Sequence, residues 1–313
     1  MLNLFFLLLL FVGVYPPWAN AGESPPEICK PYLQDHNQSG HNTKARESIP
    51  YSDGLLWEIR NSHDGVSFLF GTMHSQDKKV TSIPPPVRLA LVQSRTLLIE
   101  VVPNQQAQQQ FVESIYFTDD SSLESLLDKE IYNELIMKIP GYGITAENLW
   151  RFKPWAVFTL IGRPRPVNAM TQEQVLMQLA LDANKSVAGL ETMEELVGTL
   201  DGISMDDQII ILNDTVCNHS EIIRKTRDLV DLYLARDLAG MVIFNEQPHY
   251  DEAIFARFMQ RILYDRNNLI LEKIDPYLQH GGAFIAVGAS HLPDEKGLLK
   301  LLEGKGYKIN KIY

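Results

Sequence analysis

The chain is poor in cysteine, with only Cys29 and Cys217 among its 313 residues. Neither lies in a CxxC pair or in a zinc-finger spacing, so neither a redox-active dithiol nor a cysteine-based zinc site is expected. In an oxidising compartment the two cysteines would pair and tie the polar N-terminal stretch to the body of the protein. In a reducing compartment they would stay as thiols. The sequence leaves both alternatives open.

Positive charge is also scarce, because 28 Lys and Arg residues stand against 39 Asp and Glu, for a formal net charge of −11. Proteins that bind nucleic acid rely on basic surfaces for most of their non-specific affinity, so no nucleic-acid partner is expected. Hydrophobic residues make up 45% of the chain. That fraction is enough to build a core and excludes a disordered or collagen-like protein.

No apolar run is long enough to span a membrane. The longest, Leu4–Val14, has eleven residues, whereas a transmembrane helix needs about 20. It is followed by Pro16 and Pro17 and then by Ala19-Asn20-Ala21, which is typical of a signal peptide with its cleavage site.

Residues 1–21 are therefore predicted to be a signal peptide of a secreted or periplasmic protein, with no stable membrane span after cleavage. An uncleaved membrane anchor is the alternative, because the first residues carry no Lys or Arg. Residues 22–53 are polar and read as a linker, which leaves 54–313 as one domain.

Short apolar runs alternate with helical segments after the linker. Leu55–Arg60 and Val66–Gly71 read as a β-hairpin, because the turn between them ends in Asp64-Gly65. Further strands are predicted at 96–102, 185–190, 283–287 and 307–312. This alternation predicts an α/β fold with a mixed, partly parallel central sheet flanked by helices.

Most of the remaining residues are predicted to be helical. The stretch from about 103 to 180 is expected to form a helical insertion, as a lid or a subdomain. A further helix is predicted at 172–183. Two or three long helices are expected between 191 and 275.

Four predicted strands end in polar residues that strand propensity does not require. His74 and His291 each close a GxxH motif, beginning at Gly71 and Gly288, while Glu100 and Glu191 follow two other apolar runs. Ligands of open α/β sheets bind outside the carboxyl ends of the strands. If these four strands are parallel and adjacent, two imidazoles and two carboxylates meet at one edge.

Two imidazoles with one or two carboxylates suit a divalent transition metal (Mn, Co or Zn) with an open position for water. Such a metal generates a nucleophile for hydrolysis. Without a metal, a histidine polarised by a glutamate serves as general base. Two non-catalytic alternatives stay open: Glu100 as the ion-pair partner of an arginine, and Glu191 as a first-turn helix acid.

The other histidines lie in polar or loop contexts and are predicted to be solvated. They are His36, His41, His63, His219, His249 and His280.

The GxxH motifs and their surroundings resemble the TraB/GumN (TraB/PrgY/GumN) family, which includes plasmid pheromone-shutdown proteins and the animal Tiki proteases. The resemblance runs from Leu56 to Tyr313. The segments that carry it are Leu56–Ile59, Phe70–Ser75, Leu98–Glu100, Phe152–Trp155, Gly189–Thr192, Arg266-Asn267 and Val287–Leu292.

This resemblance implies a fold related to that of erythromycin esterases and of a haem-binding lipoprotein. For Tiki-like members it implies a metal-dependent peptidase that uses His74, His291 and Glu100, with Glu191 next. Arg266 and Asn267 would hold a substrate carboxylate or an oxyanion.

One departure from the family pattern concerns the segment before Leu176. The Gly-hydrophobic-Asp of many members is absent, since residues 166–169 read Pro-Val-Asn-Ala and Glu173 is the nearest acid.

Three functions follow as hypotheses. The first is an exported, metal-dependent hydrolase that acts on peptides, with catalytic His74, His291 and Glu100. The second is a non-catalytic protein that sequesters a peptide, haem or metal. The third is a metal-independent, esterase-like hydrolase in which His74 and Glu100 act as base and partner on a peptide or small-molecule substrate.

Overall fold

The structure is a computed structural model that describes residues 11–12, 26–33, 46–102, 104–246 and 251–313. The predicted signal peptide lies outside the described residues except for Phe11–Val12, a short strand β1 that pairs in parallel with β4 (His74–Ser75). The predicted linker is described at 26–33 and 46–53. In the described part of the chain no helix combines the length and apolar character needed to cross a membrane.

A six-stranded mixed sheet forms the centre of the fold, in the order β6-β5-β7-β3-β2-β8. The pairs β6–β5, β5–β7 and β7–β3 are parallel, whereas β2 is antiparallel to both β3 and β8. The predicted fold class and hairpin are confirmed. The strands are β2 (Leu56–Arg60), β3 (Val66–Thr72), β5 (Thr96–Ile99), β6 (Ser186–Gly189), β7 (Ala283–Gly288) and β8 (Lys308–Lys311).

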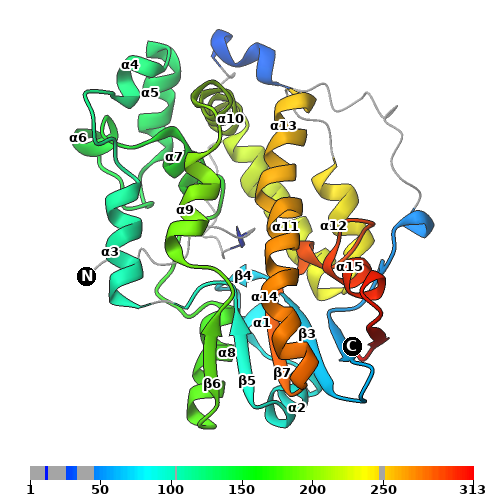
Figure 1. Cartoon of the computed structure of the whole chain (residues 1–313). Coiled ribbons are helices and arrows are strands. Elements are labelled where there is room, and N and C mark those ends of the chain that lie inside the picture. The colour runs from blue at the N-terminus through cyan, green and yellow to red at the C-terminus, as the bar shows by residue number, and fades with distance from the viewer. Residues whose placement is uncertain (1–10, 13–25, 34–45, 103, 247–250) are drawn as a thin grey trace.

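Strand β7 lies inside the sheet, and all six of its residues are buried. A parallel strand covered on both faces must be apolar at every position, which explains the unbroken run of Ala283–Gly288. The main core around the sheet includes side chains of helices on its faces, and Figure 1 shows α14 crossing in front of the sheet. These helices are α1 (Lys78–Thr81), α2 (Pro85–Gln93), α8 (Gln172–Asp182), α11 (His219–Leu234), α12 (Leu238–Asn245), α14 (Arg266–His280) and α15 (Leu298–Gly304).

A second hydrophobic core belongs to a group of helices above one end of the sheet (Figure 1). The predicted helical insertion is therefore present, but its bounds were wrong. Leu176 and Ala180 of α8 pack into the sheet core, and the helical group is completed by α9 and α10. Its helices are α3 (Gln105–Ser114), α4 (Leu123–Leu126), α5 (Lys129–Lys138), α6 (Ala146–Leu149), α7 (Pro154–Ile161), α9 (Met193–Asp201) and α10 (Met205–Cys217).

The prediction of two or three long helices between 191 and 275 was wrong, since six α-helices begin in the described part of that range. Local signals divide them: Ser204 and Asp237 cap α10 and α12, and Arg236 takes a left-handed conformation with φ 62° just after α11. The last two helices of this range, α13 (Glu252–Met259) and α14, are joined by η3 (Gln260–Asp265), a π-helical turn.

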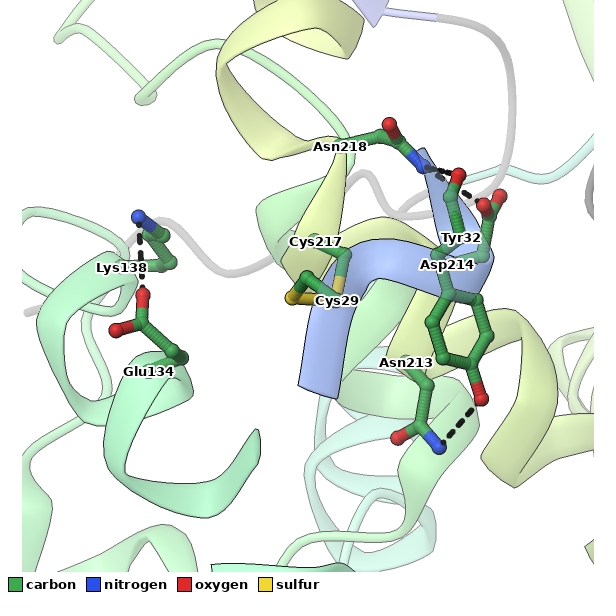
Figure 2. Close-up of a disulfide and its surroundings, with 8 residues drawn as sticks. All are labelled: Cys29, Tyr32, Glu134, Lys138, Asn213, Asp214, Cys217 and Asn218. Carbon is green, nitrogen blue, oxygen red and sulfur yellow. Dashed lines mark hydrogen bonds and ion pairs between the residues drawn. A yellow bond between two sulfur atoms is a disulfide. The ribbon is translucent and has the colours of Figure 1, made fainter. Parts of the chain in front are cut away.

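A disulfide joins Cys29 to Cys217 and fastens the N-terminal helix η1 (Glu27–Tyr32) to the end of α10 (Figure 2). Two amides support the same contact: Asn213 Nδ2 donates to the Tyr32 hydroxyl at 3.1 Å, and Asn218 Nδ2 donates to the Tyr32 carbonyl at 2.9 Å. The sequence had left pairing open. The structure shows that part of the polar linker is attached to the helical group.

Removal of this disulfide is expected to lower the free energy of unfolding by about 2–5 kcal/mol, because the bond closes a loop between residues 188 positions apart. Urea unfolding of the wild type with and without reductant, beside the Cys29→Ser/Cys217→Ser variant, measures the effect. The double variant should match the reduced wild type and be insensitive to reductant. Equal unfolding midpoints for the oxidised wild type and the variant would contradict this expectation.

Candidate active site at the carboxyl ends of the parallel strands

The four strands that precede the predicted site residues are parallel and adjacent in the sheet, which is what the four residues need if they are to form one site. In register, Thr72 on β3 pairs with Gly288 on β7, and Ile99 on β5 pairs with Ala286 on β7 and with Gly189 on β6. The residues that follow these strands therefore leave the sheet at the same edge. His74, His291, Glu100 and Glu191 are all buried there.

Gly71, the first residue of the first GxxH motif, packs directly against the second motif. A Cβ at Gly71 would lie 2.8 Å from Leu292 Cδ1 and 3.0 Å from Ala289 Cα. Real Cβ atoms avoid such distances, so only glycine allows the two motifs to approach this closely. The sequence identified both motifs but not this contact of Gly71 with Ala289 and Leu292.

His291 is held by an amide. Its Nδ1 lies 2.6 Å from Asn267 Oδ1, while Asn267 Nδ2 donates to the Lys296 carbonyl at 2.8 Å. Among the described residues, Nε2 of His291 has no hydrogen-bond partner although it is buried. Burial, with the charge of Arg266 adding to it, places the pKa of His291 well below the usual histidine value, so the ring is neutral.

His74 is held by a carboxylate. Its Nδ1 lies 3.0 Å from Oε2 of Glu173, the second residue of α8, and both side chains are buried. Burial also lowers the pKa of His74. Burial opposes the ionisation of Glu173, but the contact with His74 outweighs it and keeps the pKa of this carboxyl below its usual value.

The neighbour of Glu173 fixes the backbone of the same motif. Gln172 Oε1 accepts from the Met73 amide at 2.9 Å, and Gln172 Nε2 donates to the Val80 carbonyl at 2.7 Å. The hydroxyl of Tyr233 lies 2.9 Å from Gln172 Oε1 and 3.0 Å from the Gly71 carbonyl oxygen. A capping box formed by Thr171 and Gln174 fixes the first turn of α8 that carries these contacts.

Arg266 binds both glutamates. Its Nη2 donates to Glu100 Oε2 at 2.6 Å and to Glu191 Oε2 at 2.5 Å, and its Nε donates to Glu191 Oε1 at 2.9 Å. The other oxygen of Glu100 accepts from the Gly288 amide at 2.7 Å, at the first residue of the second GxxH motif. The sequence left an arginine partner for Glu100 open, and this arginine is Arg266.

The pKa of Glu100 is raised to about 7. Burial is the main cause and the charge of Glu191 adds to it, while Arg266 acts in the opposite direction. Burial by itself lowers the pKa of the Arg266 guanidinium, but the charges and hydrogen bonds of Glu100 and Glu191 outweigh burial, so the pKa is raised.

The family model described as TraB/PrgY/gumN matches residues 55–311, which include both GxxH motifs and all six strands of the central sheet. The chain belongs to the TraB/PrgY/gumN family. The family resemblance deduced from the motifs is thereby confirmed.

Among curated proteins, the chain is similar to three relatives in this family. It is 22% identical to metalloprotease TIKI2 of Danio rerio (82% of this chain, 60% of the relative) and 23% identical to metalloprotease TIKI1 of Xenopus tropicalis (90% and 66%). It is 22% identical to metalloprotease TIKI1 of Homo sapiens (82% and 61%). The chain thus spans less than two thirds of the length of these relatives. No solved structure matches the chain.

Within this TraB/PrgY/gumN chain the predicted metal ligands divide into two kinds. The imidazoles of His74 and His291 are oriented by Glu173 and Asn267, while the two glutamates bind Arg266. Across the described ranges no group of three or more His, Cys, Asp or Glu side chains is arranged to hold a metal ion. The predicted four-residue metal site stays a prediction.

Sequence reasoning missed Glu173 as a site residue. The available signal was its position three residues before Leu176, as the acid nearest to the place where the expected Gly-hydrophobic-Asp is absent. Its contact partner His74 is far away in the sequence, so no local pattern linked the two.

The remaining histidines lie apart from this site or outside the described residues. His63 and His280 are exposed, as predicted, whereas His36, His41 and His249 fall in parts that the structure does not describe. The prediction was wrong for His219, which is half-buried with its Nε2 3.3 Å from the Tyr142 hydroxyl. Burial, with Lys138 and Arg165 contributing, lowers the pKa of His219 to about 4.

Proposed function

We propose that this chain is an exported, metal-dependent hydrolase that cleaves peptides at the carboxyl edge of its parallel strands. The observation that carries the proposal is a pair of buried histidines on two adjacent strand ends, one of them with an Nε2 lacking any hydrogen-bond partner in the described residues. The names of the curated relatives, metalloproteases at 22–23% identity, support the same class of reaction. The disulfide is in keeping with an oxidising compartment.

The donor chemistry of His74 and His291 fits a divalent transition metal such as Mn, Co or Zn, because neutral imidazole is a ligand that these ions accept. The carboxylates of Glu100 and Glu191 fit Arg266 in the described arrangement. We therefore propose His74 and His291 as the metal ligands. Glu100 and Glu191 would become ligands only if they gave up their ion pairs with Arg266. When bound, such an ion lowers the pKa of water and polarises a carbonyl group.

The chain's own residues have separable tasks in this proposal. Glu173 and Asn267 orient the two imidazoles. Glu100 accepts a hydrogen bond from the Gly288 amide and so fixes the turn that carries His291. Arg266 holds the two carboxylates together. We propose that Arg266 and Asn267 do not bind the substrate directly, as the sequence predicted, but act through the side chains that they contact. Arg266 already binds Glu100 and Glu191, and Asn267 already binds His291. A substrate carboxylate or oxyanion would have to displace these partners.

One observation favours a second candidate function, a hydrolase without metal. His74 and Glu173 form a buried imidazole–carboxylate pair, the arrangement of a general base and its orienting group. In that reaction His74 Nε2 would take the proton of an attacking water while Glu173 balances the new charge. The partner of His74 would then be Glu173 and not Glu100.

A peptide-library digest of the purified full chain, paired with its elemental analysis, tests the proposal. We expect cleavage that a chelator stops and that Mn²⁺, Co²⁺ or Zn²⁺ restores, together with bound metal in the untreated protein. Cleavage that survives the chelator would replace this proposal with the metal-free hydrolase. Saturable binding of peptide, haem or metal with no cleavage product would show a non-catalytic binding protein.

A further inference from the structure

Both GxxH histidines are supported in the same way, by the first two residues of a helix. Helix α8 begins with Gln172-Glu173 and α14 begins with Arg266-Asn267. In each pair the second residue contacts the histidine Nδ1: Glu173 lies 3.0 Å from His74 and Asn267 lies 2.6 Å from His291.

The first residue of each pair fixes the backbone of the corresponding motif. Gln172 accepts directly from the amide of Met73, one residue before His74. Arg266 acts through Glu100, whose Oε1 accepts from the amide of Gly288, three residues before His291. Two segments far apart in the sequence thus supply equivalent pairs of contacts.

The chemistry of the two Nδ1 partners fixes where each imidazole carries its proton. Asn267 donates through its Nδ2–H to the backbone carbonyl of Lys296, so its Oδ1 faces His291 and can only accept. An ionised Glu173 likewise has only acceptors. Each neutral ring must therefore carry its proton on Nδ1, and the lone pair is left on Nε2. A metal-bound histidine is commonly oriented by such a partner on its second nitrogen.

We propose that Glu173 and Asn267 are matched positioning residues that hold His74 and His291 in the same tautomer, with the ring proton on Nδ1 and the lone pair on Nε2, the nitrogen that would bind a divalent metal. This inference rests on the proposed function for the identity of the ligand. The tautomers themselves follow from the contacts of the apoprotein. Glu173 is the residue that the sequence did not assign to the site.

The two positioning residues differ in one respect that makes the inference testable. Glu173 is a carboxylate and Asn267 is an amide, yet each contributes one oxygen acceptor. If acceptance at Nδ1 is the function, the amide in Glu173→Gln can replace the carboxylate. The apolar side chain in Glu173→Met has a similar length and no oxygen, so it cannot.

The experiment is a long-range ¹H–¹⁵N correlation spectrum of the metal-free full chain labelled with ¹⁵N-histidine, at pH 8. We expect His74 and His291 in the Nδ1–H form in the wild type and in Glu173→Gln. In Glu173→Met only the His74 signals should move toward the Nε2–H form, and in Asn267→Leu only those of His291. Glu195→Met is the matched control, because Glu195 is an exposed helix acid that pairs with Lys273, and it should change neither ring.

Zinc binding gives a second readout. Competition with a colorimetric chelator should show that Glu173→Met and Asn267→Leu each weaken Zn²⁺ binding by about 10–100-fold, while Glu173→Gln and Glu195→Met stay near the wild type. An unchanged His74 tautomer in Glu173→Met, or unchanged zinc affinity in that variant, would overturn the inference. If Glu173→Met does not fold, an Nε2–H tautomer of His74 in the wild type would overturn it.

These outcomes are separate from those of the proposed function. The tautomers are measured without metal or substrate, so a peptide digest without product would refute the hydrolase and leave the positioning residues standing. Conversely, chelator-sensitive cleavage with an Nε2–H form of His74 would keep the hydrolase and reject this role of Glu173.

Discussion

His291→Gln is expected to lower kcat/KM for peptide cleavage by about 10²–10⁴-fold, the range typical for loss of a positioned proton-transfer group, and further if metal binding is lost. The reason is that Nε2 of His291 is buried with no hydrogen-bond partner in the described residues, so its lone pair is available for chemistry. A glutamine side chain fills much of the same volume but provides no imidazole. His74→Gln should have an effect of the same order.

Glutamine is a better replacement than alanine at these positions. Both histidines are almost fully buried, at 2% exposure for His74 and 1% for His291, and truncation of a buried side chain leaves a cavity that itself destabilises the protein. The assay should use a peptide found in the library digest, with thermal unfolding recorded for each variant. His280→Gln is the matched control, because His280 is exposed at the end of α14. Wild-type turnover in both site variants would refute the assignment of this site.

Arg266→Met is expected to lower the free energy of unfolding by about 3–5 kcal/mol, as is typical when one partner of a buried ion pair is removed. The substitution would leave Glu100 and Glu191 buried, close to each other and without their cation. Urea unfolding of the variant and the wild type measures the loss. By comparison, Arg257→Met removes an exposed arginine that pairs with Asp207, and it should cost only about 0–1 kcal/mol.

The effect of Arg266→Met should be larger at pH 8 than at pH 5. The folded-state pKa of Glu100 is about 7, above the usual glutamate value of 4.5, so its contribution to stability is fully present below 4.5 and is lost as the pH rises through 7. Removal of the nearby cation raises the pKa of Glu100 further, so at pH 5 this carboxyl is neutral and tolerates burial better.

The triple variant Glu100→Gln/Glu191→Gln/Arg266→Met provides the control for this prediction. It removes both charges together with their cation, so it should be more stable than Arg266→Met alone at pH 8. A triple variant no more stable than the single one, or equal losses for Arg266→Met and Arg257→Met, would contradict the role of Arg266 as the charge partner of the two glutamates.

Much of the sheet could be predicted because its signals are local. The Asp64-Gly65 turn marks the hairpin of β2 and β3, and the unbroken apolar run of Ala283–Val287 marks an interior parallel strand. The helical region was harder, since α8 and α9 are successive helices along the chain but pack into different cores. A helix's apolar stripe shows that it is buried on one side and does not show against what.

The sequence by itself determined the family, the mixed α/β sheet, and the position of His74, His291, Glu100 and Glu191 just after parallel strands. These features depend on residue type and short-range spacing, which can be read directly from the sequence. Only the tertiary structure decided that Arg266 binds both glutamates, that Asn267 orients His291 and that Glu173 orients His74. A buried polar side chain takes whichever partner the packed fold brings within hydrogen-bond distance. The partner Glu173 lies 3.0 Å from His74 in space, and that proximity is set by how α8 packs on the sheet.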